Sequence, residues 1–371
     1  MDNVINDKYQ IQLEILTPLS IGAGSETEWT KGVDFVISQN KLYHLDLRKM
    51  KEVGIDINKL AAFWAEKNQD AVIKIIGSNL TKVSDRIMDI PCDTDNNIKT
   101  FIVNQLSQKP IIPGSSIKGA IRSVLFSYLR DKETKDSDVF GSLKDGSDFM
   151  RFIRISDFDF EKTALVNTKI YNLFGYNDDW QGGWKHAFQN GTNTSFSPTG
   201  FNTIYECLLP QEKAIGNIML AEKLWEKISE LQPCYDKKKE FFSHVGRDEE
   251  GEYETSPIEN LFFQINSHTY DYLDKERAFF NMYRQGEHSD KIIQSINGLM
   301  HRVNDCIDNG RSCILKMAAG TGFHSITGDW QYQNYNLGID PKTGKKKYKS
   351  RKIAINNNQY TLMGFVKLSI I

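Results

Sequence analysis

Apolar and polar residues alternate near the start of the chain and recur at helical spacing further on. Residues 9–17 alternate and predict an amphipathic strand, and residues 35–37 are expected to pair with residues 42–45 across a short turn. Asp46 is expected to cap a short helix and Asn58 a second one, and residues 70–80 continue the helical pattern. This order of strands and helices predicts an α+β fold with helices on one face of a sheet.

The stretch of residues 111–128, IIPGSSIKGAIRSVLFSY, is the one around which the prediction is organised. It predicts the end of a strand, a Pro113-Gly114 turn, and a helix capped by Ser115 or Ser116. The apolar positions that are expected to face inward are Ile117, Ile121, Val124, Leu125 and Tyr128.

The second half repeats this order of elements. We expect strands at 201–209 and 214–220, helices at 222–231, 257–284 and 289–307, and strands at 311–317, 353–355 and 360–370. The sequence thus predicts a duplicated α+β unit, with residues 1–160 as the first unit and 201–371 as the second. Residues 161–200, rich in Asn, Gly and Trp, are interpreted as an irregular insertion between them.

The aromatic residues of that insertion leave two interpretations open. Trp180, Trp184, His186 and Phe188 could stack on nucleic-acid bases, or they could pin the insertion to its own domain, which is the commoner role. Trp29 lies in a polar stretch, residues 25–32, and is expected to be exposed on a protruding loop.

The charge of the chain is balanced overall but segregated locally. The 371 residues carry a net charge of −2, so bulk charge does not favour nucleic acid. Residues 342–352, KTGKKKYKSRK, nevertheless contain seven Lys or Arg residues and no acid, whereas residues 247–254 are acidic and are expected to form a solvated loop. Lys347 and Arg351 in the basic run are candidate RNA contacts.

The remaining residue types exclude several classes of protein. The five cysteines form no CxxC pair, which fits a reducing cytoplasm and gives no zinc signature. No signal sequence or membrane-length apolar run is visible, so a cytoplasmic protein without a membrane partner is expected. Since Walker, Rossmann and Ser-His-Asp patterns are also missing, we expect no cofactor and no metal.

Three glycine turns that follow predicted strands are candidate ligand sites, because backbone without a Cβ can approach a ligand closely. The first, residues 19–24, contains Gly22 and Gly24, and the second begins the central helix, where Lys118 and Arg122 lie one turn apart. A helix start with two cations favours phosphate, and Ser115 and Ser116 can donate hydroxyl hydrogen bonds. The residues predicted to bind RNA at the third turn are Gly320, Thr321, Gly322, Phe323 and His324.

Six segments, taken in order, resemble the RAMP proteins of type III CRISPR effector complexes. They are LTPLSIGAG, PIIPGSSIKGAIRSVL, RISD, the Tyr205-Glu206-Cys207 strand, AAGTGFHS and MGFVKL. Within these proteins the chain is most similar to the family of fifth Csm subunits of the type III-A class. The resemblance implies two ferredoxin-like (RRM-like) units with helical insertions, whose sheets and glycine-rich loops hold guide RNA (crRNA).

The resemblance also implies a role and a set of partners. A subunit of this family caps the 3′ end of the crRNA, near the complementary target RNA, and docks on the Csm backbone and small helical subunits. It assists maturation of the crRNA 3′ end, with host nucleases doing the trimming, and is not itself the slicing enzyme.

Two alternatives stay open beside a noncatalytic RNA-binding subunit. The first is a RAMP ribonuclease that cleaves through Asp34, which could orient a metal, or through His324 as a general acid or base. For Asp34 the simpler interpretation is a turn-stabilising carboxylate. The second alternative is a protein scaffold whose long helices bind neighbouring subunits.

Overall fold

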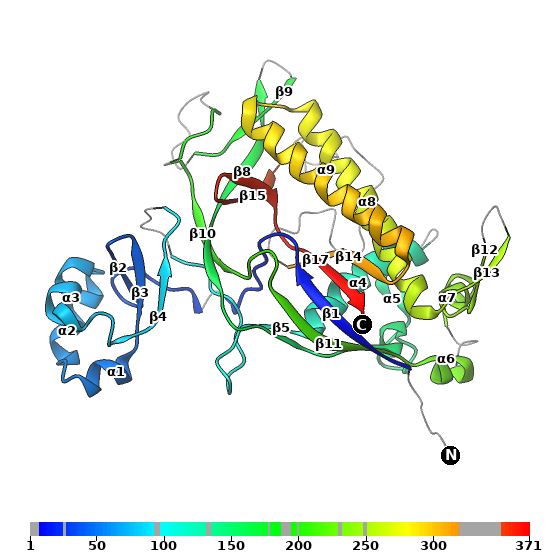
Figure 1. Cartoon of the computed structure of the whole chain (residues 1–371), viewed down its shortest axis with the longest axis horizontal. Coiled ribbons are helices and arrows are strands. Elements are labelled where there is room, and N and C mark those ends of the chain that lie inside the picture. Colours follow the sequence, from blue (N-terminus) through cyan, green and yellow to red (C-terminus); the bar gives the residue numbers. More distant parts are fainter. Residues whose placement is uncertain are drawn as a thin grey trace.

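The computed structural model describes residues 7–24, 27–92, 97–130, 135–176, 179–186, 194–198, 200–228, 232–247, 251–318 and 350–371. Its centre is an antiparallel sheet of five strands in the order β14-β17-β1-β11-β6. These are β14 (Ser312–Lys316), β17 (Phe365–Ile370), β1 (Asp7–Ile15), β11 (Lys213–Leu220) and β6 (Ile153–Ile155). The two predicted units therefore share one sheet, because its strands come from both sides of the expected boundary (Figure 1).

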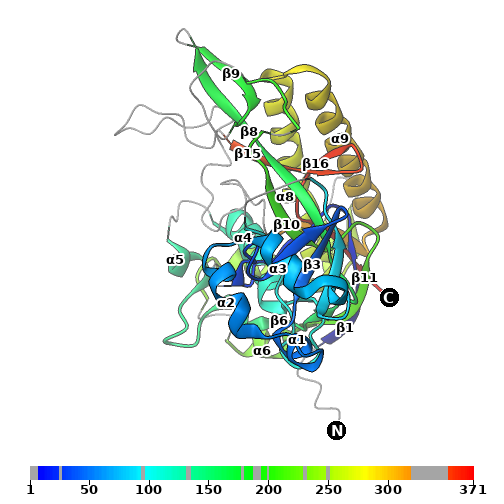
Figure 2. The same cartoon turned by 90° about the vertical axis from the view of Figure 1, so that its left-hand side faces the viewer.

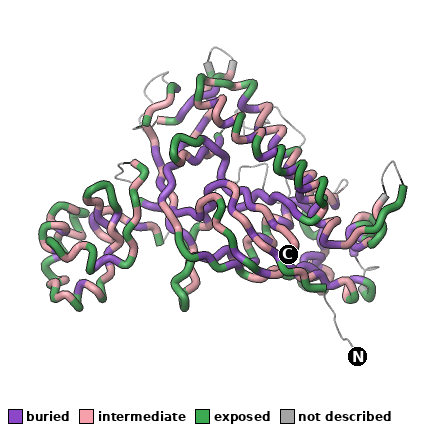
Figure 3. Tube along the Cα trace, in the orientation of Figure 1, coloured by how far each residue is buried: buried purple, intermediate pink, exposed green. Residues whose placement is uncertain are grey.

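Helix α4 (Gly114–Leu129) packs on the apolar face of this sheet. The period of two in β1 places Ile11, Leu13 and Ile15 on that face, where they are fully buried. The helix buries Ile117, Ile121, Val124 and Leu125 and half-buries Tyr128, which confirms the predicted apolar face. The core of the molecule lies between these two elements, and the tube in Figure 3 is mostly buried along the central strands.

A second antiparallel sheet has the order β10-β8-β15-β16, and β9 pairs with β8. Its strands are β10 (Thr203–Cys207), β8 (Ala164–Tyr176), β15 (Ser350–Asn356), β16 (Gln359–Leu362) and β9 (Asp179–Trp184). The prediction of an irregular insertion at 161–200 was wrong for residues 164–176 and 179–184. The polar residues Asn167, Thr168 and Lys169 hid the strand pattern, yet all three are buried, because β8 lies between two neighbours in the sheet.

Two long helices, α8 (Pro257–Met282) and α9 (Gly286–Asn309), lie side by side across both sheets (Figures 1 and 2). Helix α8 also covers the free edge of β14. The Asn266 side-chain amide donates to Ser312 O at 3.0 Å and accepts from Ile314 N at 2.9 Å, and Thr269 Oγ1 donates to Ile314 O at 2.6 Å. These bonds satisfy backbone groups that would otherwise offer an edge for another strand.

A small lobe projects from the body, at the left in Figure 1 and facing the viewer in Figure 2. It consists of β2 (Phe35–Ser38), β3 (Lys41–Leu45), α1 (Leu47–Glu52), α2 (Ile57–Ala65), α3 (Gln69–Ile76) and β4 (Ser84–Asp89). The predicted hairpin and the Asp46 cap of α1 are confirmed. The predicted Asn58 cap was wrong, since α2 begins two residues earlier and Asp56 accepts the Asn58 N–H at 3.1 Å.

The shorter elements complete the chain. They are β5 (Ile111–Ile112), α5 (Asp136–Phe140), η3 (Phe149–Phe152), β7 (Phe158–Asp159), α6 (Glu222–Ile228), α7 (Tyr235–Phe241), β12 (Val245–Arg247) and β13 (Glu252–Glu254). Within the acidic segment that was expected to be a loop, residues 252–254 form the exposed strand β13, which pairs with β12. The whole agrees with the predicted α+β class, while the division into two ferredoxin-like units stays a prediction.

Candidate nucleic-acid interface

The start of α4 is packed closely against the end of β6 and the residues that follow it. The Gly114 N–H donates to Asp157 Oδ1 at 2.8 Å, and a Cβ at residue 114 would lie 2.1 Å from Ile155 O. Only glycine fits this approach. The N-cap is Pro113, with no side-chain cap bond, so the predicted capping role of Ser115 and Ser116 was wrong.

Both serines lie instead in the first turn of α4, where Ser115 is exposed and Ser116 half-buried. Lys118 follows one turn along, also half-buried. Burial lowers the pKa of Lys118, and the charges of Arg122 and Arg154 lower it further against the opposing effect of Asp148. The first turn of α4 therefore carries two hydroxyl groups near the cations Lys118, Arg122 and Arg154.

Arg154 on β6 was missed in the sequence. It is exposed, and neither it nor Lys118 forms an ion pair with any of the residues that the structure describes. The alternation of residues 153–155 indicates its exposure, because a polar residue between Ile153 and Ile155 on a strand points to the opposite face from them. Together with Ser115, Ser116 and Lys118, Arg154 forms what we call the α4 cation site.

Arg122 is already engaged by carboxylates. Its guanidinium bonds to Asp136 and, at 3.2 Å, to Asp148, and it lies 4.1 Å from the centre of the Phe140 ring. Burial alone would lower the pKa of Arg122, but these carboxylates outweigh burial and raise it. Arg122 thus links α4 to α5, and its charge is paired with the carboxylates of Asp136 and Asp148.

Arg351 is not at the surface, in contrast to its prediction as an RNA contact. It is 8% exposed, and its Nε lies 2.7 Å from Oε2 of Glu276, which is 1% exposed. Its guanidinium also lies 3.8 Å from the centre of the Phe279 ring on the same helix. The carboxylate that engages Arg351 comes from α8, 75 residues away in the sequence, and an RNA contact at Arg351 stays a prediction.

The predicted glycine turns are only partly described. Gly24 has φ +114° and its carbonyl accepts from Thr27 Oγ1 at 2.9 Å, so this turn requires glycine. Gly22 forms a β-bridge with Phe101. The other predicted contacts, Gly320, Thr321, Gly322, Phe323, His324 and Lys347, lie outside the described residues.

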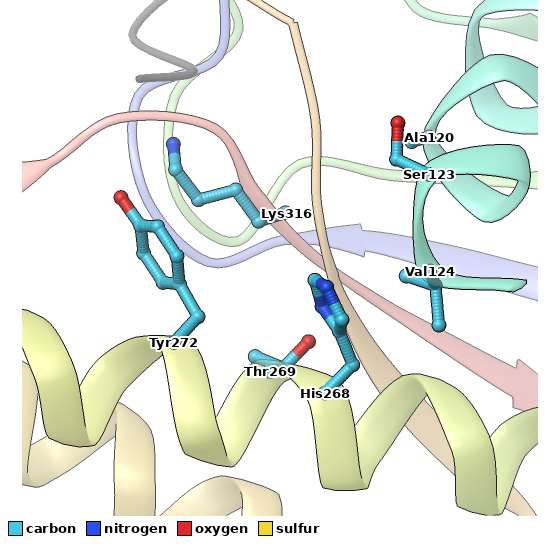
Figure 4. A pocket seen from close by; sticks show the side chains of 7 residues that line it. All are labelled: Ala120, Ser123, Val124, His268, Thr269, Tyr272 and Lys316. Carbon is cyan, nitrogen blue, oxygen red and sulfur yellow. The ribbon is translucent and has the colours of Figure 1, made fainter. Parts of the chain in front are cut away.

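Figure 4 shows a small cavity between α4 and α8, next to the end of β14. It is lined by Ala120, Ser123, Val124, His268, Thr269, Tyr272 and Lys316. Its volume is about 10 Å³, which is room for roughly one water molecule and not for a nucleotide.

Lys316 is the charged residue of this cavity. Its Nζ donates to Met363 O at 2.6 Å and lies 5.0 Å from the centre of the Phe365 ring. Burial lowers the pKa of Lys316 to about 7, although the charge of Glu276 opposes the shift. Burial also lowers the pKa of His268 to about 4. Burial therefore favours the uncharged form of both basic side chains of this cavity.

The carboxylate that was considered for catalysis stabilises a turn. Asp34 Oδ2 accepts the Thr30 N–H at 2.7 Å, which is the simpler of its two interpretations. Within the described part of the chain, no group of three or more His, Cys, Asp or Glu residues is placed to hold a metal ion.

Trp184, one of the candidate stacking residues, is a core residue, and so is Trp29. Trp184 is 2% exposed and lies edge-on to Tyr171, with ring centres 5.3 Å apart, so it pins the β8-β9 hairpin to the body. Trp29, expected on an exposed loop, was wrongly placed: it is 9% exposed, with its ring 4.3 Å from that of His44. Phe188 lies outside the described residues.

The chain was compared with protein-family models, with curated proteins and with solved structures. A family model described as the RAMP superfamily matches residues 12–291. No curated protein matches the chain in sequence.

Two solved structures share the fold along their whole length. One is a chain of the cryo-EM structure of a Csm–crRNA–target RNA ternary complex of a type III-A CRISPR-Cas system, with a TM-score of 0.64 and 17% identity over 98% of this chain and 100% of that one. The other is the crystal structure of Csm5 from T. onnurineus, with a TM-score of 0.57 and 14% identity over 97% and 100% of the two chains.

Among the described residues, no helix is both long and apolar enough to span a membrane.

Proposed function

The chain belongs to the RAMP superfamily, and we propose that it is a noncatalytic RNA-binding subunit of a type III-A CRISPR (Csm) ribonucleoprotein. The observation that carries this proposal is the fold, which matches the complete length of a subunit from a Csm–crRNA–target RNA complex. The likeness to T. onnurineus Csm5 supports the position of a fifth Csm subunit.

The proposed role is to bind and cap the 3′ region of the crRNA. The α4 cation site supplies two cations and two hydroxyl groups at the start of a helix, and this set suits the phosphates of single-stranded RNA. The glycine-rich residues 320–324 and the basic residues near Lys347 are proposed to extend the interface. Two ferredoxin-like units, as the resemblance implies, are proposed to carry these parts.

The proposed partners follow from the same role. The subunit docks on a Csm backbone subunit and contacts small helical subunits and target RNA near the crRNA 3′ end. Host nucleases trim the crRNA up to the protected end, in the cytoplasm.

We also propose that the chain does not cut RNA. The hydrogen bond of Asp34 to the Thr30 backbone supports a structural role for that carboxylate. The rival is cleavage through Asp34 or His324, and Asp34→Asn tests it, since loss of specific cleavage with retained RNA binding would favour the nuclease.

The test of RNA binding is charge reversal at the α4 cation site. Lys118→Glu with Arg154→Glu in the reconstituted ribonucleoprotein is expected to lower affinity for crRNA by about 10-fold or more at 0.15 M salt, because two phosphate contacts become repulsive. The 3′ portion of the crRNA is expected to become sensitive to added exonuclease. Lys144→Glu with Lys162→Glu, two exposed lysines outside the site, is the matched control. An unchanged crRNA end and unchanged affinity would contradict the proposal.

A further inference from the structure

Asp157 places a carboxylate next to the cations at the start of α4. Its Oδ1 accepts the Gly114 N–H at 2.8 Å, and the residue is exposed. Arg154 lies three residues before Asp157 on the same segment, and Lys118 lies about one helical turn beyond Gly114. The carboxylate is therefore at the surface on which the α4 cation site is proposed to meet RNA.

The backbone on both sides of Asp157 is fixed. The Ser156 N–H donates to Asn217 O at 3.0 Å, and Ser156 Oγ accepts the Asn217 N–H at 2.8 Å. Phe158 is fully buried and pairs with Ile112 where β5 meets β7. Together with the bond to Gly114, these contacts hold the carboxylate in place before any ligand arrives.

Only one of the two carboxylate oxygens is used within the protein. Oδ1 is bonded to Gly114, whereas Oδ2 forms no hydrogen bond and no ion pair with any residue that the structure describes. An ionised carboxylate accepts hydrogen bonds and donates none. Oδ2 is thus suited to a hydroxyl donor of a ligand, while its charge repels phosphate.

A carboxylate beside cations distinguishes between the two kinds of nucleic acid. RNA and DNA both carry phosphates for Lys118 and Arg154, but only RNA has a 2′-hydroxyl that can donate to a carboxylate oxygen. With DNA, the Asp157 carboxylate faces the phosphates without a hydrogen-bond donor. A site that leaves a polar group unpaired with one ligand rejects that ligand in favour of one that pairs it.

We propose that Asp157 selects RNA over DNA at the α4 cation site, by accepting a hydrogen bond from a ribose 2′-hydroxyl through Oδ2 while Oδ1 stays bonded to Gly114. The inference rests on the proposed function, because it names the residue that distinguishes the sugar of the bound strand. A carboxylate that only capped α4 would affect the binding of RNA and DNA equally, and the experiment uses this difference.

The test compares the affinities of the full-length chain for fluorescent octauridylate and octadeoxyuridylate. The unmodified chain is expected to bind the ribo strand about 10-fold more tightly, as one hydrogen bond to a charged group allows. Asp157→Asn keeps a side-chain oxygen for the Gly114 N–H and removes the charge. It is expected to lower the ratio of the two affinities to about 3-fold or less, chiefly because the deoxy strand binds more tightly.

A control variant and a third strand separate the hydroxyl from other causes. Asp159→Asn removes an exposed carboxylate two residues further along, on β7, and is expected to keep the ratio of the unmodified chain. An octauridylate with fluorine at each 2′ position keeps the sugar pucker of RNA but has no 2′ donor. It is expected to bind the unmodified chain as weakly as the deoxy strand does.

Three results would overturn the inference. They are an unchanged ratio in Asp157→Asn, an equal loss of affinity for both strands in that variant, and binding of the 2′-fluoro strand as tightly as the ribo strand. The last comparison uses the unmodified chain, so it decides even if Asp157→Asn does not fold, which thermal unfolding would show. Failure of the proposed function gives a different result, namely an unchanged affinity of the Lys118/Arg154 variant for octauridylate.

Discussion

The start of α4 and the start of β15 both carry cations that the sequence predicts as RNA contacts, but the structure uses them in opposite ways. Lys118 on α4, and beside it Arg154 on β6, which the sequence did not predict, form no ion pair among the described residues, whereas Arg351 is buried against Glu276. Arg122 lies between the two cases, half-buried and paired with Asp136 and Asp148. A cation in a motif is available to RNA only if the fold has not already neutralised it.

The largest expected effect comes from breaking the buried pair. Glu276→Gln leaves Arg351 charged and buried without its carboxylate, which is expected to lower the free energy of unfolding by about 3–5 kcal/mol. Urea denaturation measures this change. Glu287→Gln, which removes an exposed pair with Lys291 on α9, is expected to leave the urea midpoint unchanged. Equal midpoints for the two variants would show that burial does not distinguish these pairs.

The next effect concerns the glycine that holds the start of α4. Gly114→Ala places a methyl group 2.1 Å from Ile155 O, so backbone must shift and the free energy of unfolding is expected to fall by about 1–3 kcal/mol. Gly119→Ala is the matched control on the same helix, because nothing lies within 4 Å of its added Cβ.

The control is expected to stabilise the protein by about 0.5–1 kcal/mol, as alanine is the better helix former. Thermal unfolding of both variants would show whether each substitution lowers or raises the stability of the protein. If Gly114→Ala were as stable as Gly119→Ala, the close approach to β6 would not constrain α4.

A pH-dependent effect is expected from Lys316. Its pKa is about 7 in the folded protein and near 10.5 when unfolded, so between these values the unfolded chain binds more protons. Stability should therefore rise with pH from about 7 to 10.5, by at most about 1.4 kcal/mol per pH unit. Lys316→Met is expected to make this rise shallower in denaturation curves recorded at several pH values, while Lys169 and Lys238, whose pKa values burial lowers to about 8, keep part of it. A rise of the same slope in Lys316→Met would assign it to another group.

The sequence predicted local secondary structure better than it predicted contacts between distant segments of the chain. The apolar face of α4, the hairpin at the start of the lobe and the long helices follow from periodicity alone. The β8 strand did not, because Asn167, Thr168 and Lys169 are polar residues that become buried only when β10 and β15 pair on either side. Such burial depends on contacts between distant segments, which a single sequence does not show.

The site shows the same limit. Lys118 was found from its place beside a helix start, but Arg154, which lies on a separate strand, was missed. The engagement of Arg351 by Glu276 could not be read from spacing, since the two residues are 75 positions apart. The helix was therefore predicted correctly and its RNA contacts stay a prediction, while the sorting of the nearby cations into paired and unpaired required the three-dimensional structure.

The most direct measurement of the central claim is the length of the crRNA protected by the ribonucleoprotein that contains Lys118→Glu and Arg154→Glu. Both residues lack a carboxylate partner among the described residues, so the double variant is expected to unfold as the unmodified protein does while the 3′ portion of its crRNA is lost to exonuclease. A fully protected 3′ end in a folded, assembled variant would contradict the claim that the unpaired cations at the start of α4 hold the RNA.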